Sequence, residues 1–281
     1  MVDSASPPVT LDIIITGRND GYGGEDFHER FVAAAAFNHA RLNEAGVRHR
    51  FVLVEWNPPE GRPLLAELIG ARLPWWHEAI VVCRAWHAWL SENPRLQFME
   101  FFAKNAGIRR SRADWILTTN SDVFLSRAVV ERLARGQLTP GTLYRAARLD
   151  MDRHMAWREM TWELLEDPRC LLRRLEPIPP YYNEAAGDFL LLDRGSWERV
   201  GGFNERVRFS KIHKDGQFCL QAHHHGLAIE LLGEVYHLDH NGSFVTSQHQ
   251  YGPGYHDAPF GPQWDCSKPY RNRDDWGLRP A

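Results

Sequence analysis

The sequence has few cysteines, no long apolar run and no excess of one charge sign. Its four cysteines lie far apart without C-x-x-C spacing, so we expect reduced thiols and no disulfide framework. The formal net charge of −3, from 33 basic and 36 acidic residues, argues against a nucleic-acid backbone as the main partner. No apolar run approaches a membrane span, and the first residues lack the pattern of a signal peptide. We therefore expect a soluble, cytoplasmic protein with no nucleic-acid partner and no transmembrane segment.

The 281 residues are enough for one large domain with a sizeable core. We expect a disordered tail at residues 1–10 and a single domain at 11–242, with a first half at 11–126 and a second at 127–242. Residues 243–281 are dense in Gly, Pro, Tyr, Trp and His and show weak periodicity, which predicts an irregular C-terminal segment or a lid.

Short apolar strands alternate with amphipathic helices along this domain. A strand at 11–16, a Gly-rich loop at 17–24, a helix from 25 to 46 and a strand at 49–55 predict two adjacent parallel strands with a right-handed crossover. Further strands are expected at residues 79–83, 115–119, 142–147, 189–192, 227–232 and 235–238, and helices at 63–69, 84–90, 98–112, 128–135, 157–165, 196–200 and 214–225. Residues 167–186 are expected to form a surface loop. The alternation indicates an α/β fold.

The Gly-rich loop is not a dinucleotide-binding fingerprint. Gly17, Gly21, Gly23 and Gly24 do not have the G-x-G-x-x-G spacing, so we set aside an NAD enzyme.

The stretch Asn120-Ser121-Asp122 follows a short apolar strand directly. Side chains at positions i and i+2 of an extended chain point to the same side, so Asn120 and Asp122 can direct two oxygen ligands beyond the strand's carboxyl end. Open α/β sheets bind ligands at this edge, and oxygen ligands suit Mg²⁺ or Mn²⁺, which in turn suits a diphosphate. The alternative interpretation is an Asx turn that caps the next helix.

Other motifs accompany this stretch in a definite order. Lys104-Asn105-Ala106-Gly107 precedes it, and Gly187-Asp188 follows, ahead of a strand and a Gly-Gly-Phe-x-Glu turn at 201–205. Lys214-Asp215 and then His237-Leu238-Asp239-His240 come later. From about residue 11 to 240 this order resembles the nucleotide-diphosphosugar transferases of GT-A fold, close to the large inverting group that includes the catalytic domains of cellulose and hyaluronan synthases. The resemblance implies a Rossmann-like domain with a mixed, mostly parallel sheet.

The resemblance implies a donor site in the first half and an acceptor site in the second. The residues that it assigns to the nucleotide-sugar donor are Thr16, Gly17, Arg18, Asn19, Asp20, Glu55, Lys104, Asn105 and Asn120. Asp122 would be the main ligand of a divalent cation, Mn²⁺ or Mg²⁺, and His237 or His240 a further one. An extended segment would place these two histidines on opposite faces, so which of them points inward stays open. The motif departs from the family's Asp-x-Asp because an amide replaces the first carboxylate.

In the second half the resemblance implies an inverting hexosyl transfer to an unknown hydroxyl acceptor, such as a saccharide, a lipid-linked glycan or a small molecule. Asp215 would act as the general base, with Asp188 as the competing candidate or as a ligand of acceptor hydroxyls. The family's Glu-Asp pair matches Lys214-Asp215, so only the second carboxylate is present.

Two other functions remain open from the sequence. The changes at Asn120 and Lys214 would also fit a non-catalytic nucleotide- or carbohydrate-binding protein on a degenerate transferase fold. A zinc hydrolase that uses His237 and His240 is a third possibility. A sugar nucleotidyltransferase is disfavoured because residues 17–24 do not provide that class's pyrophosphate loop.

Overall fold

A computed structural model describes residues 10–21, 24–76, 78–239, 251–255 and 269–278. The expectations for residues 1–9 and for most of the segment 243–281 lie outside the described residues. The described strands are β1 Thr10–Gly17, β2 Arg48–Trp56, β3 Glu78–Val82, β4 Trp115–Thr118, β5 Val123–Leu125, β6 Thr142–Met151, β7 Leu171–Leu175, β8 Leu190–Asp193 and β9 Ala228–Leu238.

These strands form one nine-stranded sheet in the order β3-β2-β1-β4-β8-β6-β9-β5, with β7 paired to β6 outside this path. β1 pairs in parallel with β2 and β4, and β2 with β3. β8 runs antiparallel to β4 and to β6, whereas β6 and β9 are parallel. The expected α/β fold with a mixed, largely parallel sheet is confirmed.

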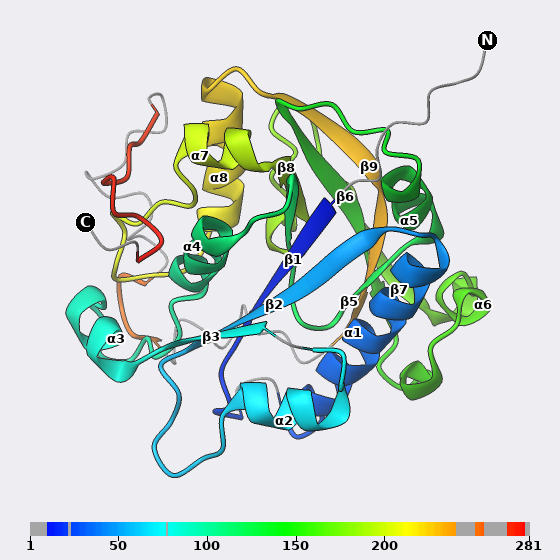
Figure 1. The fold of residues 1–281 in the computed structure, drawn as a ribbon, viewed down its shortest axis with the longest axis horizontal. Helices are drawn as coiled ribbons and strands as arrows, with labels where there is room; N and C mark the ends of the chain where they lie inside the picture. Colours follow the sequence, from blue (N-terminus) through cyan, green and yellow to red (C-terminus); the bar gives the residue numbers. More distant parts are fainter. Residues whose placement is uncertain (1–9, 22–23, 77, 240–250, 256–268, 279–281) are drawn as a thin grey trace.

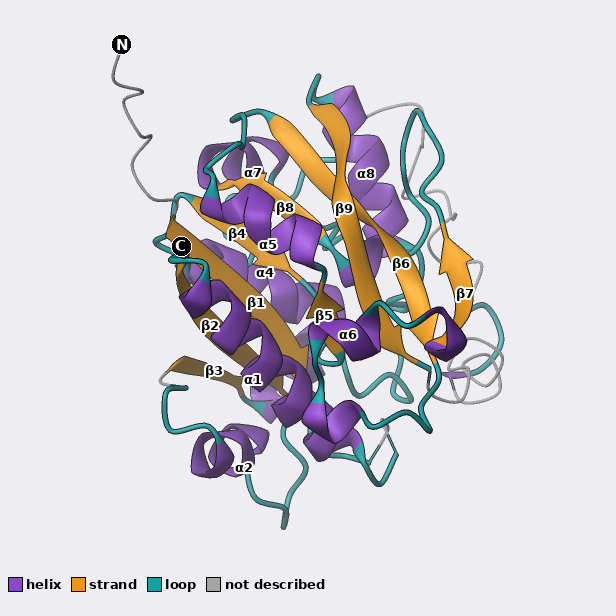
Figure 2. Ribbon diagram, turned by 90° about the vertical axis from the view of Figure 1, so that its right-hand side faces the viewer, coloured by secondary structure: helices purple, strands orange, loops and turns teal. Residues whose placement is uncertain are grey.

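Helices cover both faces of the sheet (Figure 1; Figure 2). They are α1 Phe27–Glu44, α2 Leu65–Arg72, α3 Arg84–Leu90, α4 Glu100–Arg110, α5 Arg127–Ala134, α6 Trp162–Leu165, α7 Arg194–Val200 and α8 Lys214–His224, with short 3₁₀ turns at Trp157–Glu159, Pro168–Cys170 and Ala186–Asp188. α1 and α5 lie over one face, and α4, α7 and α8 over the other. None of the described helices is long and apolar enough to cross a membrane.

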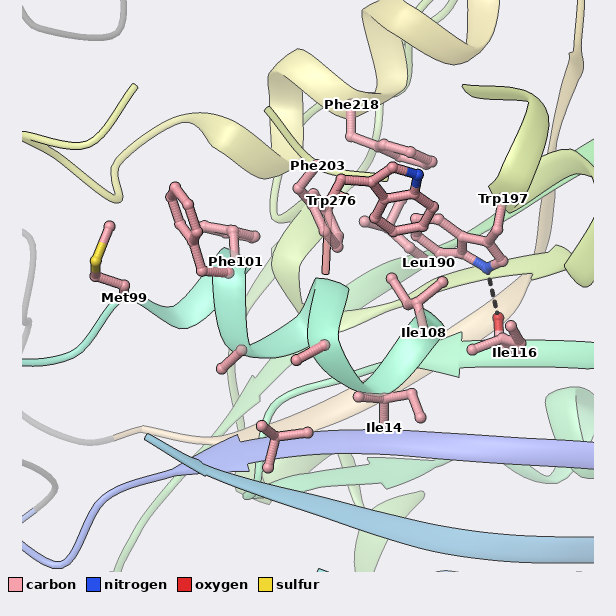
Figure 3. Close-up of a cluster of buried hydrophobic side chains, with 14 of the residues drawn as sticks. Ile14, Met99, Phe101, Ile108, Ile116, Leu190, Trp197, Phe203, Phe218 and Trp276 are labelled. Atoms are coloured by element: carbon pink, nitrogen blue, oxygen red, sulfur yellow. Dashed lines mark hydrogen bonds between the residues drawn. The ribbon is translucent and has the colours of Figure 1, made fainter. Parts of the chain in front are cut away.

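α4 is the central helix of its face and packs closely on β1 (Figure 3). A Cβ atom at Gly107 would lie 2.5 Å from Cγ2 of Ile14, so only glycine permits this approach. The buried Trp197 donates its indole N–H to the carbonyl of Ile116 in β4 over 3.2 Å (Figure 3). The glycine of the Lys-Asn-x-Gly motif therefore sets the depth at which Lys104 sits above the sheet.

The C-terminal residues that the structure describes pack against this same layer. The hydroxyl of Tyr270 donates to the carbonyl of Gly202 over 2.7 Å, and the amide of Asn272 donates to the carbonyl of Phe203 over the same distance. Trp276 is buried in the cluster that contains Phe203. Tyr270, Asn272 and Trp276 thus attach residues 269–278 to the core beside α4.

The structure differs from the sequence-based expectation at four strands. β5 was not expected, and it extends the sheet by pairing with β9. β6 continues past residue 147 to Met151, and residues 228–238 form the single strand β9, with a register shift where Ala146 pairs with Gly233. β7 lies inside the predicted surface loop. Its residues are largely exposed and show no alternation, so pairing with β6 decides its conformation. Residues 157–165, expected as one helix, divide into a 3₁₀ turn and α6.

Candidate active site

Strand register brings three site residues together at one edge of the sheet. Val123, the residue after Asp122, pairs with His237 of β9, and His237 pairs on its other side with Asp150 of β6. Nε2 of His237 lies 3.7 Å from Oδ1 of Asp122, and its Nδ1 lies 3.3 Å from Oδ1 of Asp150. All three side chains are nearly inaccessible to solvent. The interaction between β5 and β9 therefore assembles the pair that sequence reasoning assigned to a metal.

The ionisation of this cluster is strongly perturbed. Burial lowers the pKa of His237, but the carboxylates of Asp122 and Asp150 outweigh this effect, so the pKa is raised overall. The pKa of Asp150 is held far below its usual range, because contacts with His237, Arg148 and Arg173 outweigh the effect of burial. The cluster thus favours a charged carboxylate at position 150.

The Asp122 and His237 side chains fit a divalent cation. Metal–oxygen bonds of about 2.1 Å separate two ligands of one ion by about 3.0 Å at a right angle and about 4.2 Å when opposed. The 3.7 Å between the two facing atoms lies inside that interval. A ligating histidine commonly donates its other ring N–H to a carboxylate, and Asp150 is placed to accept it. Arg30 lies on the other side, with Nε 3.6 Å from Oδ2 of Asp122.

These two side chains are too few to enclose an ion by themselves. No group of three or more His, Cys, Asp or Glu side chains with metal-binding geometry occurs in the described ranges. His240, the other candidate ligand, lies outside the described residues. A cation here would need further oxygens from a ligand, as a diphosphate provides.

The side chain of Asn120 hydrogen-bonds to Lys104 and Asp188. Its Oδ1 accepts a hydrogen bond of 3.2 Å from Nζ of Lys104, and its Nδ2 donates over 2.7 Å to Oδ1 of Asp188. Lys104 is fully buried and also donates to Glu100 over 2.9 Å. Burial opposes ionisation of Glu100, but Lys104 and Lys211 outweigh it and lower the pKa of Glu100 to about 2.

Asp188 links Asn120 to β6. Its second oxygen, Oδ2, accepts a hydrogen bond of 3.0 Å from Arg148, which also donates over 2.6 Å to Asp150. Both oxygens of Asp188 are therefore engaged, and the residue is only 2% exposed.

Asp215 lies beside this link, in the first turn of α8. Its Oδ2 accepts a hydrogen bond of 2.7 Å from the backbone N–H of Gly187. Its other oxygen makes no hydrogen bond within the part of the chain that the structure describes, and the residue is half-buried. Lys214 points away into the core, where Nζ donates to the carbonyl of Val207 over 2.5 Å and lies 4.6 Å from the ring centre of Phe102.

The loop after β1 is held against the loop after β2. Arg18 donates to the carbonyl of Asn57 over 2.6 Å and to Asp20 over 2.7 Å, and the amide of Asn19 donates to the carbonyl of Pro63 over 2.9 Å. Thr16 and Gly17 are buried in the end of β1.

Two of the residues expected at the donor site, Glu55 and Asn105, use the polar atoms of their side chains in hydrogen bonds to the protein backbone. Each oxygen of Glu55 accepts a backbone N–H of α2, from Leu65 over 2.8 Å and from Ala66 over 3.0 Å. Burial raises the pKa of the Glu55 carboxyl. Asn105 exchanges two hydrogen bonds of 2.8 Å with the backbone of Phe203 and so fixes the Gly-Gly-Phe turn. Neither side chain has a hydrogen bond to the network around Asp122 among the described residues.

Sequence reasoning missed Arg30, Glu100, Arg148 and Asp150. The last two were detectable in principle, because Arg148 and Asp150 stand at positions i and i+2 where a strand ends, the same pattern that singled out Asn120 and Asp122. The predicted strand stopped at residue 147, so this pattern was lost. Arg30 and Glu100 are helical charges with no local sign of their role.

Many solved structures are similar to this chain, and three of them follow. A mannosyltransferase from Pyrobaculum calidifontis, solved with GDP-Man and Mn²⁺, matches with a TM-score of 0.52 and 13% identity, over 85% of this chain and 59% of that one. The catalytic domain of Drosophila β1,4-galactosyltransferase 7, solved with xylobiose, matches at 0.39 and 12%, over 79% and 64% of the two chains. Residues 1–349 of Staphylococcus aureus TarS match at 0.48 and 10%, over 82% and 60%.

The chain spans about three fifths of the length of these structures. A scan against protein families and a search of curated proteins found no match. Structural similarity at such low sequence identity establishes the fold alone. Together with the sheet order, the mannosyltransferase match confirms the expected architecture: the chain has a GT-A-like fold.

Proposed function

We propose that this chain is a divalent-cation-dependent glycosyltransferase that moves a sugar from a nucleoside diphosphate to an acceptor hydroxyl with inversion. The observation that carries the proposal is a chain of contacts from Asp122 through His237, Asp150 and Arg148 to Asp188, whose neighbour Gly187 donates its N–H to Asp215. It brings a candidate metal ligand pair and a carboxylate suited to proton removal to one edge of a GT-A-like sheet.

The donor diphosphate is proposed to bind beside Asp122 and His237. A cation held by these residues would act as a Lewis acid toward the charge on the leaving diphosphate. The buried Arg30 lies against Asp122, and the half-buried Arg148 donates to Asp150 and Asp188 beside His237. Two guanidinium groups therefore add fixed positive charge close to the proposed diphosphate position. Fixed charges that are already oriented stabilise developing negative charge without reorganisation.

Asp215 is the stronger candidate for the general base. A base needs an accessible oxygen within reach of the acceptor hydroxyl, and Asp215 is half-buried with one oxygen engaged by Gly187. Asp188 is nearly inaccessible, and its two oxygens accept from Asn120 and Arg148, so it is better suited to holding the site together. Attack promoted by Asp215 from the face opposite the diphosphate would invert the anomeric centre.

The non-catalytic alternative rested on the changes at Asn120 and Lys214. The Lys214 ammonium lies in the core against Phe102 and Val207, so it does not reverse the charge at the proposed base. Asn120 makes specific hydrogen bonds with both ends of its amide, which argues against a decayed position. A zinc hydrolase would need about three protein ligands, and the described residues offer two at Asp122.

A donor screen tests the proposal. The purified chain is incubated with a panel of nucleotide sugars, GDP-mannose and UDP-sugars included, with Mn²⁺ or with a chelator, and released nucleoside diphosphate is measured. We expect release with at least one donor and its loss with the chelator. A chain that binds nucleotides but releases none, with simple saccharides and polyprenyl phosphates also supplied as acceptors, would favour the non-catalytic alternative.

A further inference from the structure

Residues 187 and 188 connect the two halves of the proposed site. The hydroxyl of Thr119 donates to the carbonyl of Asp188 over 2.8 Å, and Lys104 donates to the carbonyl of Gly187 over 3.1 Å. On the other side, the N–H of Gly187 donates to Asp215 over 2.7 Å. This short segment therefore touches the loop after β4, α4 and the start of α8 at once.

Gly187 leaves little room for a side chain between these groups. A Cβ atom there would lie 3.2 Å from Oδ2 of Asp215 and 4.0 Å from Nδ2 of Asn120. The Asn120 amide and the Asp215 carboxylate thus approach the same glycine. Any shift of residues 187 and 188 would move the proposed base relative to the loop that carries Asp122.

The amide at position 120 is matched to its two neighbours. It accepts from the Lys104 ammonium and donates to the Asp188 carboxylate. A carboxylate could still accept from Lys104 but has no proton to give to Asp188. The two carboxylates would then face each other across a 2.7 Å contact at a buried site, where like charges repel strongly.

We propose that Asn120 is a positioning residue: its amide fixes Gly187 and Asp188, and through the Gly187 N–H it holds Asp215 in place for proton removal. This inference rests on the proposed function and deepens it. It explains why an amide stands where the resembling family has a carboxylate, and it assigns Asn120 to the base instead of to the donor or the cation.

Swapping the amide of Asn120 and the carboxylate of Asp188 tests this assignment. The double variant Asn120→Asp, Asp188→Asn keeps the net charge and reverses the direction of the hydrogen bond between the two side chains. Each single variant, the double variant and the exposed control Asn43→Asp are compared for turnover, Mn²⁺-dependent nucleoside diphosphate binding and Tm. We expect Asn120→Asp to lower kcat about 10²-fold by displacing the base, with the donor KM changed less than about threefold. Its Tm should fall by roughly 2–4 °C, since a buried hydrogen bond contributes about 1 kcal/mol to a domain of this size. The double variant should recover most of both losses.

A role of Asn120 as a cation ligand predicts the opposite pattern. Asn120→Asp would then add a carboxylate to the cation and tighten Mn²⁺-dependent nucleotide binding. That result, or a double variant that recovers neither kcat nor Tm, overturns the inference. An unmutated chain without turnover contradicts the proposed function. In that case the Tm values of the two single variants and the double variant still test the pairing of residues 120 and 188. A Tm loss in the double variant equal to the sum of the two single losses would exclude the pairing.

Discussion

Nε2 of His237 lies 3.7 Å from Oδ1 of Asp122, and the two residues meet because β9 runs antiparallel to β5. Asp150 supports the histidine from the neighbouring strand. This relationship places the proposed oxygen and nitrogen ligands of a cation in the turn just before β5 and near the end of β9.

Asp122→Ala should weaken Mn²⁺-dependent binding of nucleoside diphosphate at least about tenfold, since even loss of a group behind a metal ligand has an effect of that size. His237→Ala should weaken it as well. Titration calorimetry with Mn²⁺ and with a chelator measures the effect. Asp274→Ala, whose side chain is 96% exposed, serves as the control for loss of one carboxylate. Equal affinities for the Asp122 variant and the unmutated chain would mean that the stretch 120–122 is only a turn.

Gly107→Ala should destabilise the fold by about 1–3 kcal/mol, because overpacking a close contact displaces backbone or side chains. The new Cβ atom would lie 2.5 Å from Cγ2 of Ile14. Gly70 lies in α2, and nothing lies within 4 Å of the position that its Cβ atom would take, so Gly70→Ala should instead stabilise by roughly 0.5–1 kcal/mol. Urea unfolding of both variants gives the two free energies. A stable Gly107 variant would show that α4 does not depend on this contact.

Lys214→Met should flatten the dependence of stability on pH. Burial lowers the pKa of Lys214 to about 7, whereas an unfolded lysine stays protonated to its usual value of 10.5. Between these values the unfolded chain binds more protons, so the free energy of unfolding rises with pH, by at most about 1.4 kcal/mol per unit. Below pH 7 both states are protonated and the contribution to the slope disappears.

Urea unfolding at pH 7, 8 and 9 measures this slope. The unmutated chain should gain stability over the interval relative to Lys214→Met. Parallel pH profiles for the two proteins would show that Lys214 keeps its proton in the folded chain.

Much of the fold was predictable because local patterns and tertiary structure agree. The buried run in β1, the α4 helix with its Lys-Asn-x-Gly motif and the Ser126 cap of α5 all have the predicted conformation; the Ser126 side chain accepts the N–H of Val129 over 3.3 Å. The strand β7 was not predictable in the same way. Four of its residues are exposed, and its extended conformation depends on pairing with β6, which its own sequence does not encode.

The sequence suggests candidate site residues but not the contacts between them. Asp122 and His237 could be named from motif order, but the inward position of His237 depends on β9 register. Asn120 was expected beside the donor, yet its amide bonds Lys104 and Asp188, a long-range arrangement that spacing does not reveal.

The most direct test of the account is the turnover of Asp215→Asn, measured beside its nucleotide affinity. With the donor found by the screen, we expect kcat to fall by roughly 10²–10⁴-fold, the range that a general base contributes. Mn²⁺-dependent nucleoside diphosphate binding should stay within about threefold, since loss of kcat alone marks an interaction made in the transition state. Turnover of the variant equal to that of the unmutated chain would contradict the account.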